Sequence, residues 1–265
     1  MRRSLLGLVL FVMALCNLPA LGLDFMGAPC ASLEQGQYSI GFNYSYSDMD
    51  IDIKGSYFGN YAGSIVELPK EIKINKYYGV LGYGIRQNWD AYLMLGVPRL
   101  KAEIEHSGSV EIGCNPLLGV GTKLTFYETP QYKLGGIAQL TYASGLDIEK
   151  HVPVAIGQSV FYHDVKGELD FMEIQIAAGP TYMLNESISV YGGPFLHFIS
   201  GHFKHKDYFP GTGPLSDSTD DVREASWFGG YIGMQFKLIK GAPISVEWQH
   251  TAFADALGAN IMIRF

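Results

Sequence analysis

Beyond its first 22 residues, this chain has no long apolar run, and it carries little charge. No stretch of about 18 apolar residues occurs there, which excludes a transmembrane helix. Asp, Glu, Lys and Arg make up 17% of the 265 residues, well below the roughly 25% of an ordinary soluble domain. The formal net charge of −7 and the lack of a basic patch argue against nucleic-acid binding. Because hydrophobic residues still amount to 48%, they must be spread through short alternating stretches.

The first residues have the pattern of a secretory signal peptide. Two arginines precede an apolar run at 5–15, which is too short to span a membrane. Ala20 and Gly22 are small residues at the positions that signal peptidase reads, so we expect cleavage after Gly22. A lipoprotein signal ending at Cys16 is rejected, because the residue before a lipidated cysteine should be small and Leu15 is not.

The first stretch after this signal alternates strictly between two kinds of side chain. In QYSIGFNYSYS, large apolar residues from Tyr38 to Tyr46 share one face, and Ser, Gly and Asn share the other. A strand that faces lipid on one side and a polar lumen on the other has this pattern. The same alternation recurs near 118–126, 172–184 and 228–248. Elsewhere, as in 77–86 and 188–203, the faces mix and cannot be assigned.

Ten strands are expected in total. Their ranges are 37–47, 73–87, 89–104, 117–128, 131–144, 168–184, 187–204, 223–238, 243–251 and 257–265. Long and short connections alternate between them, which is typical of an up-and-down antiparallel barrel in an outer membrane. The predicted fold is therefore an all-β transmembrane β-barrel of about ten strands, with eight or twelve as the alternatives. The expected organisation is a signal peptide at 1–22, a periplasmic or plug segment at 23–36 and the barrel domain at 37–265.

The last of these strands, at the end of the chain, has an apolar residue at every second position. These residues are Leu257, Ala259, Ile261, Ile263 and Phe265. The ending resembles the C-terminal signature of bacterial outer-membrane β-barrels, among them the small porin-like and OmpA-like proteins. The resemblance implies a location in the cell outer membrane of a Gram-negative envelope, among lipids and lipopolysaccharide. It also implies recognition of this strand by the barrel-assembly machinery, and closure of the barrel against the first strand.

Polar residues on the inward faces form the candidate lumen network. They are Lys123, Glu173, Gln175, Gln235, Lys237, Glu247, Gln249, Asn260 and Arg264. A barrel of this size has a lumen that side chains largely fill, whereas open channels belong to 16–18 strands. We expect these groups to satisfy one another, for example as a Glu247–Arg264 ion pair, although they would also suit a narrow pore. The predicted function is thus a passive porin-like or envelope-structural role.

Two other functions remain as alternatives. An adhesin or ligand-binding barrel would act through its long outer loops, above all 48–72. An omptin-like hydrolase would need acidic and histidine side chains that converge at the outer rim. The candidates there are Asp48, Asp50, Asp52, His163, Asp164, His202, His205 and Asp207. None of the omptin motifs can be placed on them, so we expect no enzyme and no catalytic residue. Along a strand, His202 and His205 face opposite sides, so neither a metal site nor any other cofactor is expected.

Two cysteines remain after the signal peptide, Cys30 and Cys114. Export to an oxidising compartment permits a disulfide between them. In the expected topology, however, Cys30 precedes the first strand and Cys114 lies in a loop at the other end. They meet only if 23–36 threads through the lumen, so separate thiols are favoured over the bridge. The ligand, the solute and the oligomeric state do not follow from the sequence.

Overall fold

The computed structural model describes residues 23–54, 71–104, 108–112, 115–156, 159–209, 213–224, 227–239 and 241–265. All regular elements in these ranges are strands. The described residues contain no helix that could cross a membrane. The strands are β1 (Tyr38–Lys54), β2 (Glu71–Arg86), β3 (Trp89–Ile104), β4 (Gly108–Ile112), β5 (Leu117–Glu128), β6 (Tyr132–Ile156), β7 (Ser159–Met183), β8 (Ile188–Phe209), β9 (Gly213–Glu224), β10 (Phe228–Ile239), β11 (Ala242–Thr251) and β12 (Ala254–Arg264).

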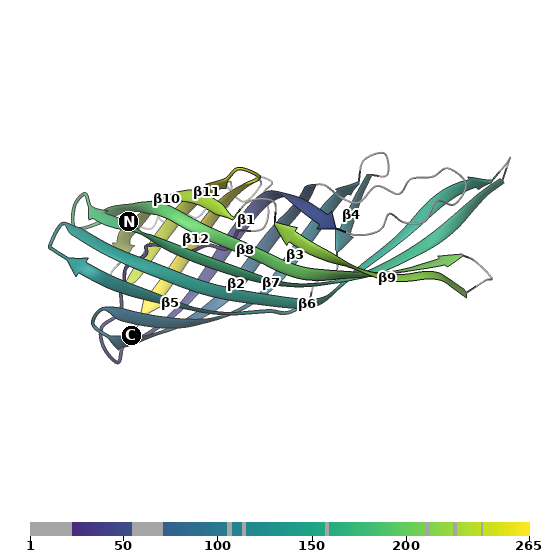
Figure 1. Cartoon of the computed structure of the whole chain (residues 1–265). Coiled ribbons are helices and arrows are strands. Elements are labelled where there is room, and N and C mark those ends of the chain that lie inside the picture. The colour runs from purple at the N-terminus through teal and green to yellow at the C-terminus, as the bar shows by residue number, and fades with distance from the viewer. Residues whose placement is uncertain are drawn as a thin grey trace, which may run out of the picture.

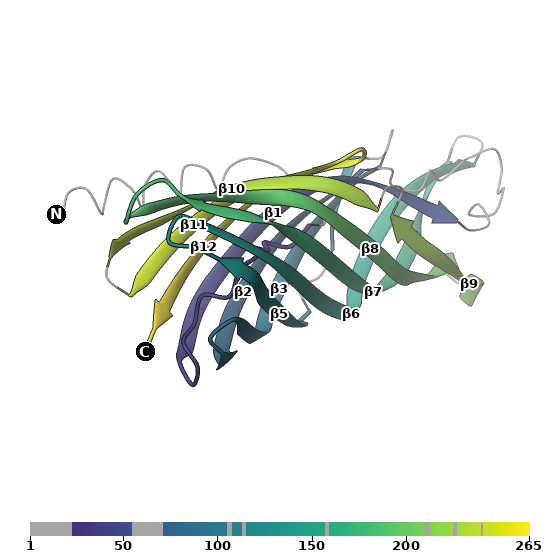
Figure 2. The same cartoon turned by 60° about the vertical axis from the view of Figure 1, so that its left-hand side comes forward.

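Ten of these strands close into an antiparallel barrel, which confirms the predicted fold (Figures 1 and 2). The order around the wall is β1-β2-β3-β5-β6-β7-β8-β10-β11-β12, and each strand pairs with its neighbours in that order. β12 closes the ring against β1, in a register that runs from Ser39↔Arg264 to Met49↔Ala254. The backbones of Tyr38 and Phe265 extend this seam with two reciprocal N–H to O bonds of 3.1 Å. A closed ring leaves no unpaired edge, as a membrane requires.

The outer wall carries the apolar side chains that the alternation predicted. Ile40, Leu118 and Ile263 are 48%, 58% and 52% exposed, whereas inward neighbours such as Ser39 are buried. Such a band is stable only against lipid, because a water-facing surface of this kind would aggregate. The closed ring and this band give the fold of an integral membrane barrel.

Inward glycines lie where an aromatic ring covers the neighbouring strand. A Cβ on Gly121 would come within 2.2 Å of the Tyr92 ring, and one on Gly233 within 2.3 Å of the Tyr191 ring. Both glycines are the direct cross-strand partners of these tyrosines. The rings therefore lie flat against the wall and occupy part of the lumen volume.

Three of the long loops expected from the sequence contain strands instead. β6 and β7 continue through 145–167, β4 lies within 105–116, and β9 covers most of 205–222. The prediction failed because it ended each strand where the membrane band ends. A hairpin satisfies its own backbone hydrogen bonds and can continue beyond the bilayer. The end of the barrel that carries these hairpins is called the hairpin end below, and the other end the short-turn end.

β9 changes the wall at the hairpin end. Its last residues pair with β8 on one side, as in Ser200↔Arg223, and with β1 on the other, as in Asp52↔Arg223. At the hairpin end, β9 therefore lies between β8 and β1 and pairs with both. Closer to the short-turn end, β10, β11 and β12 lie between the same two strands (Figure 2). The prediction of one strand over 223–238 is corrected accordingly, since 223–224 belongs to β9 and β10 begins at Phe228.

Candidate functional site in the barrel lumen

A segment before the first strand lies inside the barrel. From Leu33 at the short-turn end it rises to Leu23, and most of its side chains are buried. We call residues 23–33 the plug. The segment has no regular secondary structure, so its backbone N–H and C=O groups need partners from the wall.

The base of the plug is held by Asp90 of β3. One carboxylate oxygen accepts hydrogen bonds from the backbone N–H groups of Ser32 and Leu33, at 2.6 and 3.2 Å. One residue higher, the N–H of Ala31 donates to the Thr125 hydroxyl at 3.0 Å. A carboxylate that binds two N–H groups fixes the direction in which the chain enters the lumen.

The middle of the plug is bound in the same way by Glu247 of β11. Its two oxygens accept from the N–H groups of Met26 and Gly27, at 3.0 and 2.9 Å. Gly27 has φ of +72°, which presents these consecutive N–H groups to one carboxylate and favours glycine. From the other side of the lumen, the Lys123 ammonium donates to the Ala28 carbonyl at 2.9 Å.

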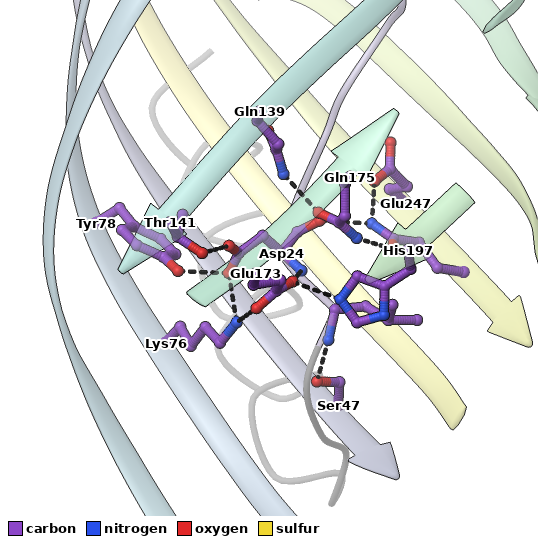
Figure 3. A network of polar contacts seen from close by, with 12 residues as sticks. Asp24, Ser47, Lys76, Tyr78, Gln139, Thr141, Glu173, Gln175, His197 and Glu247 are labelled. Carbon is purple, nitrogen blue, oxygen red and sulfur yellow. Dashed lines mark hydrogen bonds and ion pairs between the residues drawn. The ribbon is translucent and has the colours of Figure 1, made fainter. Parts of the chain in front are cut away.

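The top of the plug enters a cluster of buried charges (Figure 3). Asp24 forms an ion pair of 2.8 Å with Lys76 of β2 and accepts hydrogen bonds from Tyr78 and Thr141. Lys76 also forms an ion pair with Glu173 of β7. All these charged groups are at most 1% exposed. Buried charges must be paired. The carboxylate of Asp24 in the plug therefore helps to balance the buried ammonium group of Lys76 in the wall.

Two further groups complete the cluster. The Nε2 atom of His197 on β8 lies 3.0 Å from Glu173. A chain of amides runs from Gln139 through Gln175 and Gln249 to Glu247, with hydrogen bonds of 2.6, 3.1 and 2.7 Å. Gln249 also donates to the Asp24 carbonyl at 2.7 Å. The upper and middle anchor points of the plug are therefore parts of one network that crosses the lumen.

The structure places the predicted lumen residues in different parts of this interior. Glu173, Gln175, Glu247 and Gln249 belong to the network, and Lys123 contacts the plug beside it. Gln235 donates to Ser245, and Asn260 contacts Asn43 across the closing seam. Lys237 and Arg264 lie apart from the network, around a cavity at the short-turn end.

The expected Glu247–Arg264 ion pair is wrong. In the register of β11 and β12, Glu247 lies opposite Gly258, six residues along the strand from Arg264. The carboxylate binds the N–H groups of the plug instead. Sequence reasoning paired the two residues because their strands are neighbours, without a register to separate them.

The sequence analysis missed several important residues. One is Asp24 of the plug itself. The others contact the plug or the residues that hold it, and they are Lys76, Tyr78, Asp90 and His197. Lys76 and Tyr78 alternate with outward residues of β2, but Tyr78 and Val80 make the inner face look as apolar as the outer one. An inner face that packs on a plug contains apolar residues, and this conceals the period-two signal.

For the outer-rim candidates, the structure describes backbone pairing. Along the backbone, Asp48 lies opposite Asp255, and Asp52 lies opposite Arg223. His202 is the cross-strand partner of Asp170. No group of three or more His, Cys, Asp or Glu side chains that could hold a metal ion occurs among the described residues.

Cys30 lies in the plug with a free, buried thiol. The Thr181 hydroxyl is 3.7 Å from its sulfur, and burial raises the pKa of the thiol. Cys114 lies outside the described residues, so the disulfide between the two remains a prediction that is not favoured.

No protein-family model and no curated protein matches the chain. Among solved structures, the outer membrane protease OmpT from Escherichia coli is similar, with 10% identity and a TM-score of 0.45 over 86% of this chain and 93% of that one. The translocator domain of autotransporter NalP from Neisseria meningitidis has 9% identity and a TM-score of 0.47 over 88% and 89%. An outer membrane channel from Pseudomonas putida F1 has 13% identity and a TM-score of 0.42 over 92% and 100%.

The chain's own geometry decides the class. It has a closed ten-stranded antiparallel ring, an outward apolar band and a polar lumen. The chain folds as an outer-membrane β-barrel. In such barrels the short turns face the periplasm, so we expect the base of the plug at the periplasmic end and the hairpins at the outer surface.

Proposed function

We propose that this outer-membrane barrel is closed in its resting state and serves the envelope as a structural and surface-contact protein. The observation that carries this proposal is the plug, which is bound to the wall at three levels by Asp90, Glu247 and the Lys76 cluster. An open porin needs a continuous aqueous lumen, whereas here the chain itself occupies it.

The hairpins supply the surface on which contact would take place. The ladder of β6 and β7 continues beyond the bulge at Gly145, from Leu146↔Leu169 to Ile156↔Ser159. At about 3.3 Å per residue, this hairpin reaches roughly 35 Å beyond the bulge. Figure 1 shows it extending past the other strands. The proposed role is not enzymatic.

Conductance in a planar bilayer tests the closed state. The refolded chain beginning at Leu23 is compared with a variant that lacks 23–33 and with Asp90→Asn/Glu247→Gln, which weakens two anchor points of the plug. Lys204→Gln, at an exposed lysine near the hairpin end, is the matched control. We expect silence from the parent and the control, and discrete conductance steps from the deletion.

Each other outcome has a definite meaning. Steady conductance of the parent chain would contradict the closed state and make the protein a small porin. Conductance steps in Asp90→Asn/Glu247→Gln would favour a second function, a pore that opens when the plug leaves. That alternative is supported by the nature of the two anchors that this variant weakens, which are hydrogen bonds that water can replace.

The exposed role of the β6–β7 hairpin is tested by Glu149→Cys in a Cys30→Ser/Cys114→Ser background. A maleimide that does not cross membranes should label this cysteine on intact cells. Failure to label intact cells, with labelling after lysis, would place the hairpin in the periplasm and contradict surface contact.

We also propose that signal peptidase cleaves after Gly22, so that Leu23 becomes the first residue of the plug. Leu23 is fully buried, and its nitrogen donates to the Ser47 hydroxyl at 2.7 Å. A free α-amino group there would add a positive charge near Asp24 and Glu173, two carboxylates that share the ammonium of Lys76. Mass spectrometry of the protein purified from outer membranes should give a first residue of Leu23, and any later start would remove the top of the plug.

A further inference from the structure

The periplasmic end of the lumen contains a cavity of about 150 Å³ between the base of the plug and the wall. Its lining is strongly cationic. Lys123, Lys133, Lys237 and Arg264 contribute four positive charges, and Asp90 contributes the negative charge found among the described lining residues. These residues come from β5, β6, β10, β12 and β3, so the charges converge from around the ring.

Three of these charged groups already have partners. The Asp90 carboxylate binds the plug N–H groups, and Lys123 donates to the Ala28 carbonyl. Lys133 forms an ion pair of 2.6 Å with Glu128 outside the cavity. The remaining positive charge is concentrated at Lys237, which is exposed at the mouth, and at Arg264.

The cavity wall also contains buried polar atoms without a partner. The Nε of Arg264 and the hydroxyl oxygens of Ser39 and Ser189 are enclosed and form no hydrogen bond. Both serines are at most 2% exposed, and all three residues line the cavity. Ser39 and Arg264 are direct cross-strand partners, so their side chains enter the lumen side by side. Buried polar groups without a partner are costly, and a group of donors around one space indicates a missing acceptor.

We propose that this cavity binds a small free oxyanion of the phosphate class, which enters from the periplasm. The Arg264 guanidinium and the Ser39 hydroxyl lie side by side and can both donate, and a tetrahedral oxyanion has enough oxygens to accept from both of them and from Lys237. Arginine suits phosphate in particular, because its planar fork can bind two oxygens. The bound anion would lie next to the plug base, and its charge would offset the excess of lysine and arginine.

Phosphorus NMR of inorganic phosphate tests this site directly. The refolded full-length mature barrel in detergent is titrated with phosphate at constant ionic strength in sodium chloride. We expect saturable line broadening that weakens at least tenfold in Lys237→Gln/Arg264→Gln. Lys204→Gln removes one lysine at the other end of the barrel and should bind like the parent. Acetate in equal excess should not displace phosphate, since it is planar and has only two oxygens.

Three results would overturn the proposal. They are an absence of saturable binding by the parent, equal binding by Lys237→Gln/Arg264→Gln, and equal loss in Lys204→Gln. Displacement by acetate would overturn the phosphate class.

Ser39→Ala provides a second variant that keeps every charge, in case the double variant does not refold. Loss of the hydroxyl should weaken binding several-fold, while heat-modifiable gel mobility stays that of a folded barrel. Unchanged phosphate affinity in folded Ser39→Ala would also count against the site. Because this experiment measures binding, it is independent of whether the barrel conducts.

Discussion

At the scale of single residues, Lys76 has the largest electrostatic role in the lumen. It contacts both Asp24 of the plug and Glu173 of the wall in a fully buried site. Lys76→Met would leave two carboxylates together without their shared cation, and removing one partner of a buried pair costs about 3–5 kcal/mol. We expect a loss of this size in urea unfolding of the refolded barrel.

The companion variants separate charge from side-chain volume. Lys76→Met/Glu173→Gln should recover part of the loss, because Asp24 alone keeps its bonds from Tyr78 and Thr141. Lys204→Met removes an exposed lysine that pairs with Asp170 at 3.1 Å, and should destabilise the barrel far less, because water screens an exposed ion pair. Equal destabilisation by Lys76→Met and Lys204→Met would show that the buried cluster has no special role.

The rate at which a maleimide labels Cys30 shows whether the plug is docked in the lumen. Burial raises the pKa of its thiol, so the reactive thiolate is scarce at neutral pH, and the sulfur is also shielded from reagents. In the refolded Cys114→Ser chain, we expect maleimide labelling of Cys30 to be slow when folded and fast after unfolding in urea. Rapid labelling of the folded barrel at pH 8 would contradict a docked plug.

The same residues show which parts of the site the sequence reveals. Glu173, Gln175, Glu247 and Gln249 were predicted because they alternate with outward apolar residues and so form the opposite, polar face of their strands. Asp24 was not, because the plug has no period and its partners are up to 225 residues away, as with Gln249. Such a contact depends on how the barrel closes, which no local pattern encodes.

At the scale of elements, the plug depends on space as well as on charge. A Cβ on Gly258 of β12 would lie 2.6 Å from the ring of Phe25. Gly258→Val should therefore push the plug out of register without removing any hydrogen-bonding side chain. We expect faster labelling of Cys30 and the appearance of conductance steps.

Gly79→Val is the matched control for this substitution. Gly79 lies on the outer face of β2, where a Cβ would meet only a backbone oxygen at 3.8 Å. It adds the same side chain to a barrel strand and should leave labelling and conductance unchanged. If the Gly258→Val barrel also shows no conductance steps and its Cys30 is still labelled slowly, Phe25 does not pack where the structure places it.

The strands themselves were predictable for a different reason. Lipid selects an apolar outer face at every second residue along the wall, so all ten barrel strands were found, with their short-turn ends placed within one residue. Outside the bilayer this selection ends. The continuation of β6 and β7 beyond Gly145, and β9 as far as Val222, were therefore taken for loops.

At the scale of the whole molecule, aromatic residues mark the two edges of the apolar band. Trp248 lies near the hairpin end of β11, and Trp89 begins β3 at the short-turn end. Trp248 is 45% exposed on the outer wall, and its cross-strand partner is Leu257. Tryptophans concentrate at membrane interfaces, where their apolar ring and polar N–H group are both satisfied.

This arrangement predicts how the barrel sits in a bilayer. Variants that keep only Trp89 or only Trp248, with the other tryptophans replaced by Phe, are reconstituted into vesicles of brominated lipids. Both tryptophans should be quenched more strongly by bromine near the headgroup than by bromine near the chain ends, since they lie at opposite edges of one band. Strongest quenching of either from the chain ends would place that residue at the bilayer centre. The band would then no longer match the hydrocarbon thickness of roughly 25–30 Å, and the bilayer boundaries inferred from the fold would be wrong.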